Sequence, residues 1–261
     1  MSNYLYVLLD PTSNHVTTRG VGLKFLTKAM KKLPRNIVLL SGAKAQGSFD
    51  DYTRFEVIRG EKSVGDFINS QEFLPLPTVK WVDYDSQELF HQLTPGEIAE
   101  MLYLAHANRH WHSPFFYKLQ NNYVCLPMEN QLVKIYYRYI NEFYYQLALS
   151  FKRCLQLQRR PEKRSIFFLN QVAMPKQKIQ EPSVDFIKSL LHLLYEGVIF
   201  DFSQAYATDK TGMHIPVYLA EDQVDETMRQ LTHAKLMATI TYSRQGEWVL
   251  SDHSSNAIFG G

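Results

Sequence analysis

The stretch NQLVKIYYRYINEFYYQLALSFKRCLQLQ, residues 130–158, contains neither glycine nor proline, and a proline follows three residues later. Apolar and aromatic side chains recur in it at every third or fourth position: Leu132, Tyr136, Tyr139, Ile140, Phe143, Leu147, Phe151 and Cys154. This spacing predicts one continuous amphipathic helix over residues 130–158, about 43 Å long. Because its aromatic face is wide, we expect the helix to pack on several elements, or on a second copy of the chain in a homo-oligomer.

The first part of the chain predicts a strand, a helix and a second strand. Tyr4–Asp10 and Asn36–Leu40 are apolar runs, and Gly22–Leu33 has apolar side chains at helical spacing. This order favours a β-α-β unit with parallel strands and a right-handed crossover. A third strand at Thr53–Arg59 and a short edge strand at Thr78–Tyr84 are predicted to follow.

Other elements are predicted from end signals. Thr94-Pro-Gly-Glu97 is a capping box with proline at the first helical position, so a helix should begin there. Val184–Tyr195 and Glu221–Ala234 are predicted helices. Leu236–Tyr242 and Trp248–Ser251 flank a turn sequence, which predicts a β-hairpin near the end of the chain.

These patterns together predict an α/β fold, with a mixed α+β arrangement as the alternative. Residues 1–125 would form an N-terminal part with the β-α-β layer, and residues 126–160 the long central helix. Residues 161–261 would form an α+β part that ends in the hairpin. Because the boundary at Arg159–Arg164 is short, the first and last parts can share one core.

The composition is typical of a folded protein outside the membrane. Hydrophobic residues make up 45% and charged residues 21% of the 261 positions. No run approaches the roughly 18–20 apolar residues of a membrane span, and residues 1–10 lack the basic start of a signal peptide. Cys125 and Cys154 belong to no CxxC pair, so they predict buried thiols in a reducing compartment. We therefore expect a cytoplasmic protein.

The charge pattern leaves nucleic-acid binding as an alternative that we do not favour. The formal net charge is only +2. Lys and Arg outnumber Asp and Glu by 11 to 4 in residues 130–188, whereas the ratio is 4 to 9 in residues 195–261. A basic cluster at Lys152–Arg164 suits phosphate, but most neighbouring tyrosines fall on the face predicted to be buried.

Three histidines in residues 105–117 form a candidate metal site. His106 and His110 are four residues apart, which places them on one face of a helix, and His112 can supply a third nitrogen. Three imidazoles with an open position suit a divalent metal that activates water for hydrolysis. However, Ala107 stands where the zinc motif HExxH has glutamate. Packing roles at a helix end and in a loop are the alternative.

A second candidate site is a pocket for phosphate or a small ligand at the carboxyl ends of the two predicted parallel strands. The residues that would line it are Asp10, His15, Ser41 and Gly42. The loop after the second strand is not a P-loop, because Ser48 stands where that motif has lysine. A glycine-rich hairpin loop without a ligand is the alternative.

No catalytic signature is complete in the chain. It has no GxSxG motif, and neither cysteine has a neighbouring base in the sequence. The favoured hypothesis is therefore a non-catalytic binding or regulatory protein that acts through protein–protein contacts. A metal-dependent hydrolase at the histidines is the first alternative, and a nucleic-acid-binding protein is the second.

Overall fold

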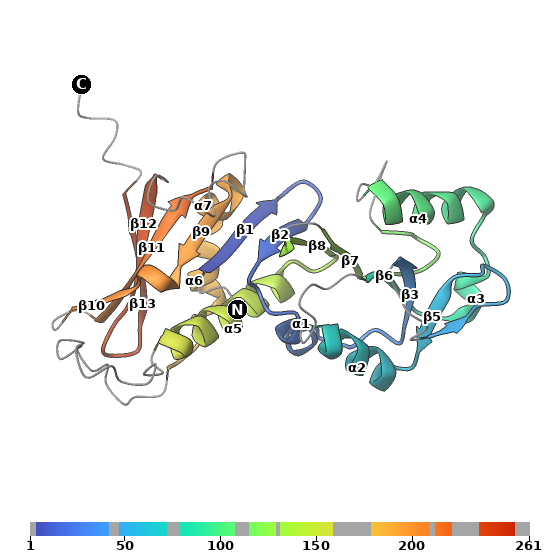
Figure 1. The fold of residues 1–261 in the computed structure, drawn as a ribbon, viewed down its shortest axis with the longest axis horizontal. Helices are drawn as coiled ribbons and strands as arrows, with labels where there is room; N and C mark the ends of the chain where they lie inside the picture. The colour runs from blue at the N-terminus through green and yellow to red at the C-terminus, as the bar shows by residue number, and fades with distance from the viewer. Residues whose placement is uncertain are drawn as a thin grey trace, which may run out of the picture. The chain divides into compact units, whose positions relative to one another are not determined.

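The computed structural model describes residues 4–41, 47–71, 79–107, 115–128, 131–158, 179–208, 212–220 and 235–253. The chain forms two compact units. The N-terminal unit comprises Leu9–Phe143, and the C-terminal unit comprises Met1–Leu8 and Tyr144–Gly261. Both contain α-helices and an antiparallel sheet (Figure 1). None of the helices in the described ranges combines the length and the apolar character that a membrane span requires.

The N-terminal unit is built on a sheet with the strand order β2-β8-β7-β6-β3-β5-β4. These strands are β2 (His15–Arg19), β8 (Val133–Tyr137), β7 (Tyr123–Pro127), β6 (Lys80–Tyr84), β3 (Asn36–Ser41), β5 (Glu56–Arg59) and β4 (Ser48–Phe49). Its helices are α1 (Lys24–Ala29), α2 (Glu61–Gln71), α3 (Gln87–Phe90) and α4 (Pro95–Ala107). Helix α4 lies on one side of this sheet, and α1 and α2 lie on the other (Figure 1).

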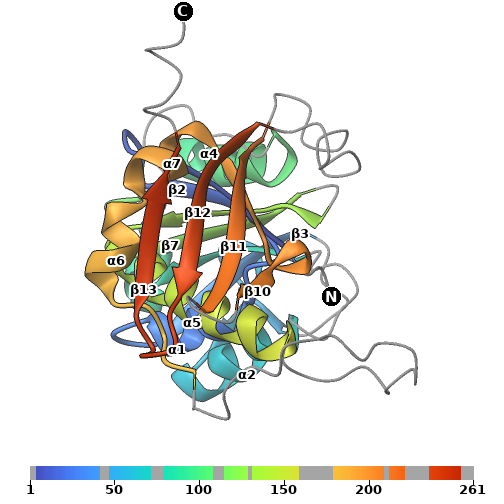
Figure 2. The ribbon, with the colours of Figure 1, turned by 90° about the vertical axis from the view of Figure 1, so that its left-hand side faces the viewer.

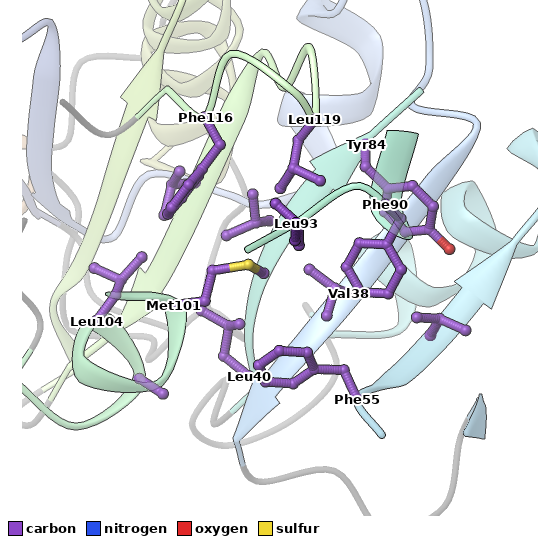
Figure 3. Close-up of a cluster of buried hydrophobic side chains, with 14 of the residues drawn as sticks. Val38, Leu40, Phe55, Tyr84, Phe90, Leu93, Met101, Leu104, Phe116 and Leu119 are labelled. Carbon is purple, nitrogen blue, oxygen red and sulfur yellow. The ribbon is translucent and has the colours of Figure 1, made fainter. Parts of the chain in front are cut away.

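The core of this unit lies between α4 and the sheet (Figure 3). Each of three neighbouring strands contributes a valine on the side of the helix: Val38 of β3, Val82 of β6 and Val124 of β7. They belong to the same buried cluster as Met101 and Leu104 of α4. The neighbouring residues, which point to the opposite face, are buried as well: Ile37, Trp81 and Cys125. Because both faces are covered, the strands read as continuous apolar runs in the sequence.

Helix α4 begins with the predicted capping box. The Thr94 N–H donates to Glu97 Oε2 at 2.7 Å, and the Glu97 N–H donates to Thr94 Oγ1 at 3.3 Å. At the other end, the Lys80 ammonium donates to the carbonyl of Ala105. A cation there complements the negative end of the helix macrodipole. The sequence prediction of this helix is confirmed.

The prediction of one helix over residues 130–158 is wrong. Val133–Tyr137 form strand β8, which pairs antiparallel with β2 and β7, and helix α5 spans only Asn141–Gln158. The strand residues are Val, Lys, Ile and Tyr, and most of these types favour strands. Because β8 is largely buried on both faces, its apolar residues fit a helical spacing equally well. The pairing partners, the preceding strand β7 and the distant strand β2, decide between the two.

The expected parallel β-α-β opening is also wrong. Strand β1 (Tyr4–Asp10) pairs antiparallel with β9 (Val198–Asp201), and β3 pairs antiparallel with β5 and β6. Strands buried on both faces are typical of parallel sheets, but an antiparallel sheet covered on both sides produces the same apolar runs. Strand β6, which was expected at an edge, lies between β3 and β7.

The C-terminal unit contains antiparallel strands in the order β13-β12-β11-β9-β1. Strand β10 (Tyr206–Thr208) pairs with β11 (Gly212–Leu219). The last two strands are β12 (Leu236–Tyr242) and β13 (Trp248–Asp252). The predicted hairpin is confirmed, because β12 and β13 pair antiparallel. The region predicted as one helix forms α6 (Val184–Ser189) and α7 (Leu191–Glu196). The predicted helix Glu221–Ala234 lies outside the described residues.

Aromatic rings fill the core of the C-terminal unit. Helix α5 lies behind the sheet in the view of Figure 2. The ring of its Phe151 is 4.8 Å from that of Phe200, 5.6 Å from that of Phe202 and 5.9 Å from that of Trp248. The ring of Phe186 on α6 is 6.1 Å from Trp248. The aromatic face of α5 is thus packed within the chain. A homo-oligomer through this helix stays a prediction, and it would have to use other side chains of the helix.

Both cysteines are buried, as the sequence predicted. Burial raises the pKa of the Cys154 thiol to about 12 and that of Cys125 well above its usual value. Because the thiolate is the reactive form, neither cysteine is a nucleophile at neutral pH.

The packing of α5 predicts a large effect of Phe151→Ala. Removing a fully buried ring leaves a cavity among the aromatic neighbours, and we expect a loss of about 3–5 kcal/mol in the free energy of unfolding. Urea unfolding followed by tryptophan fluorescence measures it. Tyr145→Ala on the same helix is the control, because Tyr145 is 38% exposed and should cost much less. Equal losses in the two variants would contradict the assignment of Phe151 to the core.

Candidate functional site

The structure brings two of the four predicted pocket residues together. His15 Nδ1 lies 3.2 Å from Asp10 Oδ2 in the turn that leads into β2. Ser41 is the last residue of β3, and Gly42 lies outside the described residues. Because β8, β7 and β6 separate β2 from β3, the two positions are about 19 Å apart at the usual strand spacing. The backbone of Ser41 is thus placed on another strand than Asp10 and His15, and a ligand pocket at these residues stays a prediction.

The turn at Asp10 and His15 also contains Ser13, but the three side chains do not form a catalytic triad. Ser13 Oγ donates to Asp10 Oδ2 at 2.8 Å and lies 2.7 Å from His15 Nδ1. A triad needs the carboxylate and the hydroxyl on opposite imidazole nitrogens, whereas here both approach Nδ1. Burial and the nearby Lys134 charge lower the pKa of His15, against the opposing effect of Asp10. The cluster closes a turn around a neutral histidine.

The histidine hypothesis is only partly within the described structure. His106 lies exposed in the last turn of α4. His110 and His112 lie outside the described residues. Within the described ranges, no three His, Cys, Asp or Glu residues are grouped so that they could hold a metal ion. A divalent metal at His106, His110 and His112 stays a prediction.

The loop between β4 and β5 is built around a buried carboxylate. The Asp50 side chain has 0% exposed surface. It accepts hydrogen bonds from the Thr53 N–H at 2.9 Å, the Thr53 hydroxyl at 3.0 Å and the Tyr52 N–H at 3.1 Å. It also lies 2.8 Å from His91 Nε2 and 3.2 Å from an Arg59 nitrogen. A buried charge persists only with such compensation, so these five contacts fix the loop.

The charge state of Asp50 follows from this environment. Burial by itself would raise the pKa of the carboxyl group. The hydrogen bonds from Thr53 and His91, together with the charge of His91, outweigh burial and hold the pKa below its usual value. Asp50 is therefore ionised at neutral pH, and its acceptor positions are filled by the protein itself.

The backbone of the same loop is tightly closed. The Asp50 N–H donates to the carbonyl of Phe55, and the Arg54 N–H donates to the carbonyl of Asp50, both at 2.9 Å. Arg54 has a φ of 62°, which is uncommon for a residue other than glycine. We call residues 48–55, which comprise β4 and the loop that follows it, the aromatic loop, because two rings project from this segment. Phe49 is 69% exposed and Tyr52 is 59% exposed.

The aromatic loop is the candidate functional site in the described structure. The Tyr52 ring lies 5.2 Å from the His91 ring, which limits its rotation. The aromatic loop also carries two exposed charged residues, Asp51 and Arg54. Aromatic residues at the centre and polar residues at the rim are the usual arrangement of a protein–protein interface. Asp50 itself is shut off from solvent, so its carboxylate serves the loop and not a ligand.

The sequence analysis missed the aromatic loop. The local signal was present as Asp50-Asp-Tyr-Thr53, since aspartate side chains often accept hydrogen bonds from the backbone two or three residues later. The side-chain partners of the buried carboxylate, Arg59 and His91, lie 9 and 41 residues after Asp50 in the sequence. The histidine reaches it from the residue that follows α3, and no sequence pattern connects the two.

Comparison of the chain with protein-family models, with curated proteins and with solved structures finds no match in any of the three.

A second buried carboxyl group lies in the N-terminal unit, on β6. Asp83 accepts from the Tyr123 N–H at 2.6 Å and from the Asn122 N–H at 2.9 Å. Burial raises the pKa of Asp83 to about 7 in spite of these hydrogen bonds. Beside it, Tyr123 donates its hydroxyl hydrogen to Glu142 Oε2 at 2.5 Å. Because Asp83 and Glu142 are both buried, we assign them to the core and not to a site.

The contacts of Asp50 predict that Asp50→Asn destabilises the N-terminal unit. The substitution removes the charge that compensates Arg59 and His91, and we expect a loss of about 2–3 kcal/mol in the free energy of unfolding. Hydrogen exchange of the aromatic loop should accelerate as well. Asp51→Asn is the matched control, since Asp51 is exposed and should change stability by less than about 0.5 kcal/mol. If both variants lose the same stability, Asp50 does not hold the loop.

The raised pKa of Asp83 predicts a pH dependence of stability. The folded chain binds this proton more tightly than the unfolded chain, in which the pKa is near 3.8. The contribution of Asp83 is therefore fully present below about pH 4 and is lost as the pH rises to about 7, by up to about 4 kcal/mol. Urea unfolding of the wild type and of Asp83→Asn at pH 4.5, 5.5 and 7.5 measures it. The advantage of the wild type should shrink with pH, and a constant difference would contradict the prediction.

Proposed function

We propose that this chain is a non-catalytic binding protein and that the aromatic loop contacts a protein partner. The observation that carries the proposal is the exposure of Phe49 and Tyr52 on a loop that one buried carboxylate holds rigid. Large aromatic side chains that stay exposed offer apolar area that a partner can bury. They are the residues that most often anchor a protein interface.

The rigidity of the loop favours tight binding. Association loses affinity whenever flexible side chains and loops must be ordered at the interface. Here the backbone is closed by the hydrogen bonds of Asp50, and the Tyr52 ring already packs beside His91. The loop backbone and the Tyr52 ring are thus ordered during folding, so less affinity is lost to ordering them at the interface.

The chemistry of the loop indicates what the partner surface contains. It needs an apolar depression that receives Phe49 and Tyr52, and polar groups around it that face Asp51 and Arg54. Charges at the rim of an interface contribute mainly to the association rate and to specificity. The partner is thus a protein with a mixed-charge surface around an apolar pocket, and not a small polar metabolite.

Photo-crosslinking identifies such a partner directly. We would place p-benzoyl-phenylalanine at position 52 and, as the control, at position 117, because Tyr117 is 93% exposed and lies outside the loop. Irradiation in cells of the source organism should give a discrete adduct from position 52 that is absent from position 117. An adduct with a second copy of the chain would instead establish a homo-oligomer. No adduct, or the same adducts from both positions, would overturn the proposal.

Substitution of the two rings then measures their contribution to affinity. We expect Phe49→Ala or Tyr52→Ala to weaken binding of the crosslinked partner by about 30-fold or more, as anchor residues do. Titration calorimetry with the purified partner measures the dissociation constants. Tyr117→Ala should leave affinity within about twofold, and all three variants should keep the unfolding midpoint because the rings are exposed. A loss below threefold for both loop variants would exclude the loop as the interface centre.

A further inference from the structure

Strand β13 lies at the end of the strand order in the C-terminal unit, and among the described strands it pairs only with β12 (Figure 2). The His253 N–H donates to the carbonyl of Met237 at 2.9 Å, which shows that residue 253 bonds towards β12. Because alternate residues of an antiparallel strand bond to the same neighbour, Trp248 and Leu250 direct their N–H and C=O groups away from β12. In the described part of the chain, no backbone hydrogen bond joins these groups to another element. The outer edge of β13 is therefore open to a further strand.

Helices α5 and α6 pack on one face of β13 and leave its other face open. The Trp248 ring lies 5.9 Å from that of Phe151 on α5 and 6.1 Å from that of Phe186 on α6, so both helices contact the same face. The residues whose side chains point to the opposite face are all exposed: Glu247, Val249, Ser251 and His253. A strand added at this edge would extend the open face and cover part of the exposed Val249 side chain.

Strand β13 lacks the features that usually protect an edge strand from pairing. Such strands are often blocked by proline, by lysine or by a β-bulge. Residues 248–252 contain neither proline nor lysine, and their register with β12 is regular throughout. The one charged residue, Asp252, is the last of the strand, and its carboxylate lies 2.9 Å from His192 Nε2. The edge is thus suited to main-chain pairing.

The sequence of β13 is complementary to itself in the antiparallel direction. When two copies pair with Leu250 opposite Leu250, each Leu250 N–H can donate to the Leu250 carbonyl of the other copy. The same register places Val249 opposite Ser251 and Glu247 opposite His253 of the second copy. No like charges then face each other within residues 247–253, and a carboxylate meets an imidazole twice. This complementarity favours a second copy of the chain over an unrelated peptide.

We propose that the chain forms a homodimer in which two β13 strands pair antiparallel about Leu250, so that the strands of two C-terminal units form one continuous sheet. This interface lies elsewhere than helix α5, through which the sequence analysis expected a homo-oligomer. A single strand pair buries less surface than a standard interface, so we expect a dissociation constant in the micromolar range. The proposal does not depend on the aromatic loop, so it can hold or fail separately from the proposed function.

Sedimentation velocity of the full chain measures the association directly. Between about 1 µM and about 300 µM, the average mass should rise reversibly from that of one chain towards that of two, and no larger species should form, because a two-fold interface is closed.

Cysteine crosslinking tests the register. Val249→Cys and Ser251→Cys are purified separately, mixed while reduced, and then oxidised. The mixture should give a disulfide-linked dimer, because facing residues of a non-hydrogen-bonded pair have Cα atoms about 4.5 Å apart. Either variant alone should give little dimer, since two identical positions would lie about 8 Å apart, beyond the reach of a disulfide. The native cysteines, Cys125 and Cys154, are buried and should not react.

Charge substitutions test the same register without a crosslink. Val249→Lys/Ser251→Lys brings lysines of the two copies face to face and should weaken dimerisation about tenfold or more. Val249→Lys/Ser251→Glu places opposite charges at the same two positions and should stay within about threefold of the wild type. Tyr206→Lys is the matched control and should leave dimerisation unchanged, because Tyr206 is 54% exposed but lies on β10, away from β13.

The outcomes decide between the proposal and its rivals. The proposal is overturned if the wild type is a monomer at about 300 µM, if the two charge variants associate equally, or if each cysteine variant crosslinks alone as readily as the mixture. Loss of the dimer in Tyr206→Lys would indicate packing of two sheet faces, and its loss in Phe49→Ala would place the second copy at the aromatic loop. Either result also overturns edge pairing. Circular dichroism confirms that each variant is folded.

Discussion

Buried backbone amides and carbonyls need hydrogen-bond partners, and this requirement governs the N-terminal unit. Its sheet is covered on both faces, so a central strand can satisfy its backbone only through two neighbouring strands. Strand β8 pairs with β2 on one side and β7 on the other, although residues 133–137 also fit the spacing of a helix. The same requirement places β6 between β3 and β7 instead of at an edge.

Buried carboxylates follow the same rule with different outcomes. Asp50 has cationic partners in addition to hydrogen bonds, so its pKa is lowered and it stays charged. Asp83 receives hydrogen bonds mainly from backbone N–H groups and has no cation beside it among its described partners, so burial dominates and its pKa is raised. The first arrangement fixes a surface loop, and the second places a carboxyl group with a raised pKa in the core. Location and partners, and not residue type, decide what each aspartate contributes.

The aromatic loop that we propose as a binding site exposes two aromatic rings on a backbone that a buried neighbour holds in place. That neighbour is Asp50, whose carboxylate accepts hydrogen bonds from Tyr52 and Thr53. The surface needs no catalytic group, in keeping with the incomplete catalytic motifs of the sequence.

The sequence by itself determined the elements whose signals are local. The capping box of α4, the β12–β13 hairpin and the burial of both cysteines follow from residues a few positions apart. Only the tertiary structure decided the antiparallel pairing, the strand at β8, and the meeting of Asp50 with His91 and of Lys31 with Tyr139. The physical reason is that an apolar run buried on both faces satisfies several local patterns equally well. Partners outside the local segment then select one of them, and His91, which meets Asp50, lies 41 residues away.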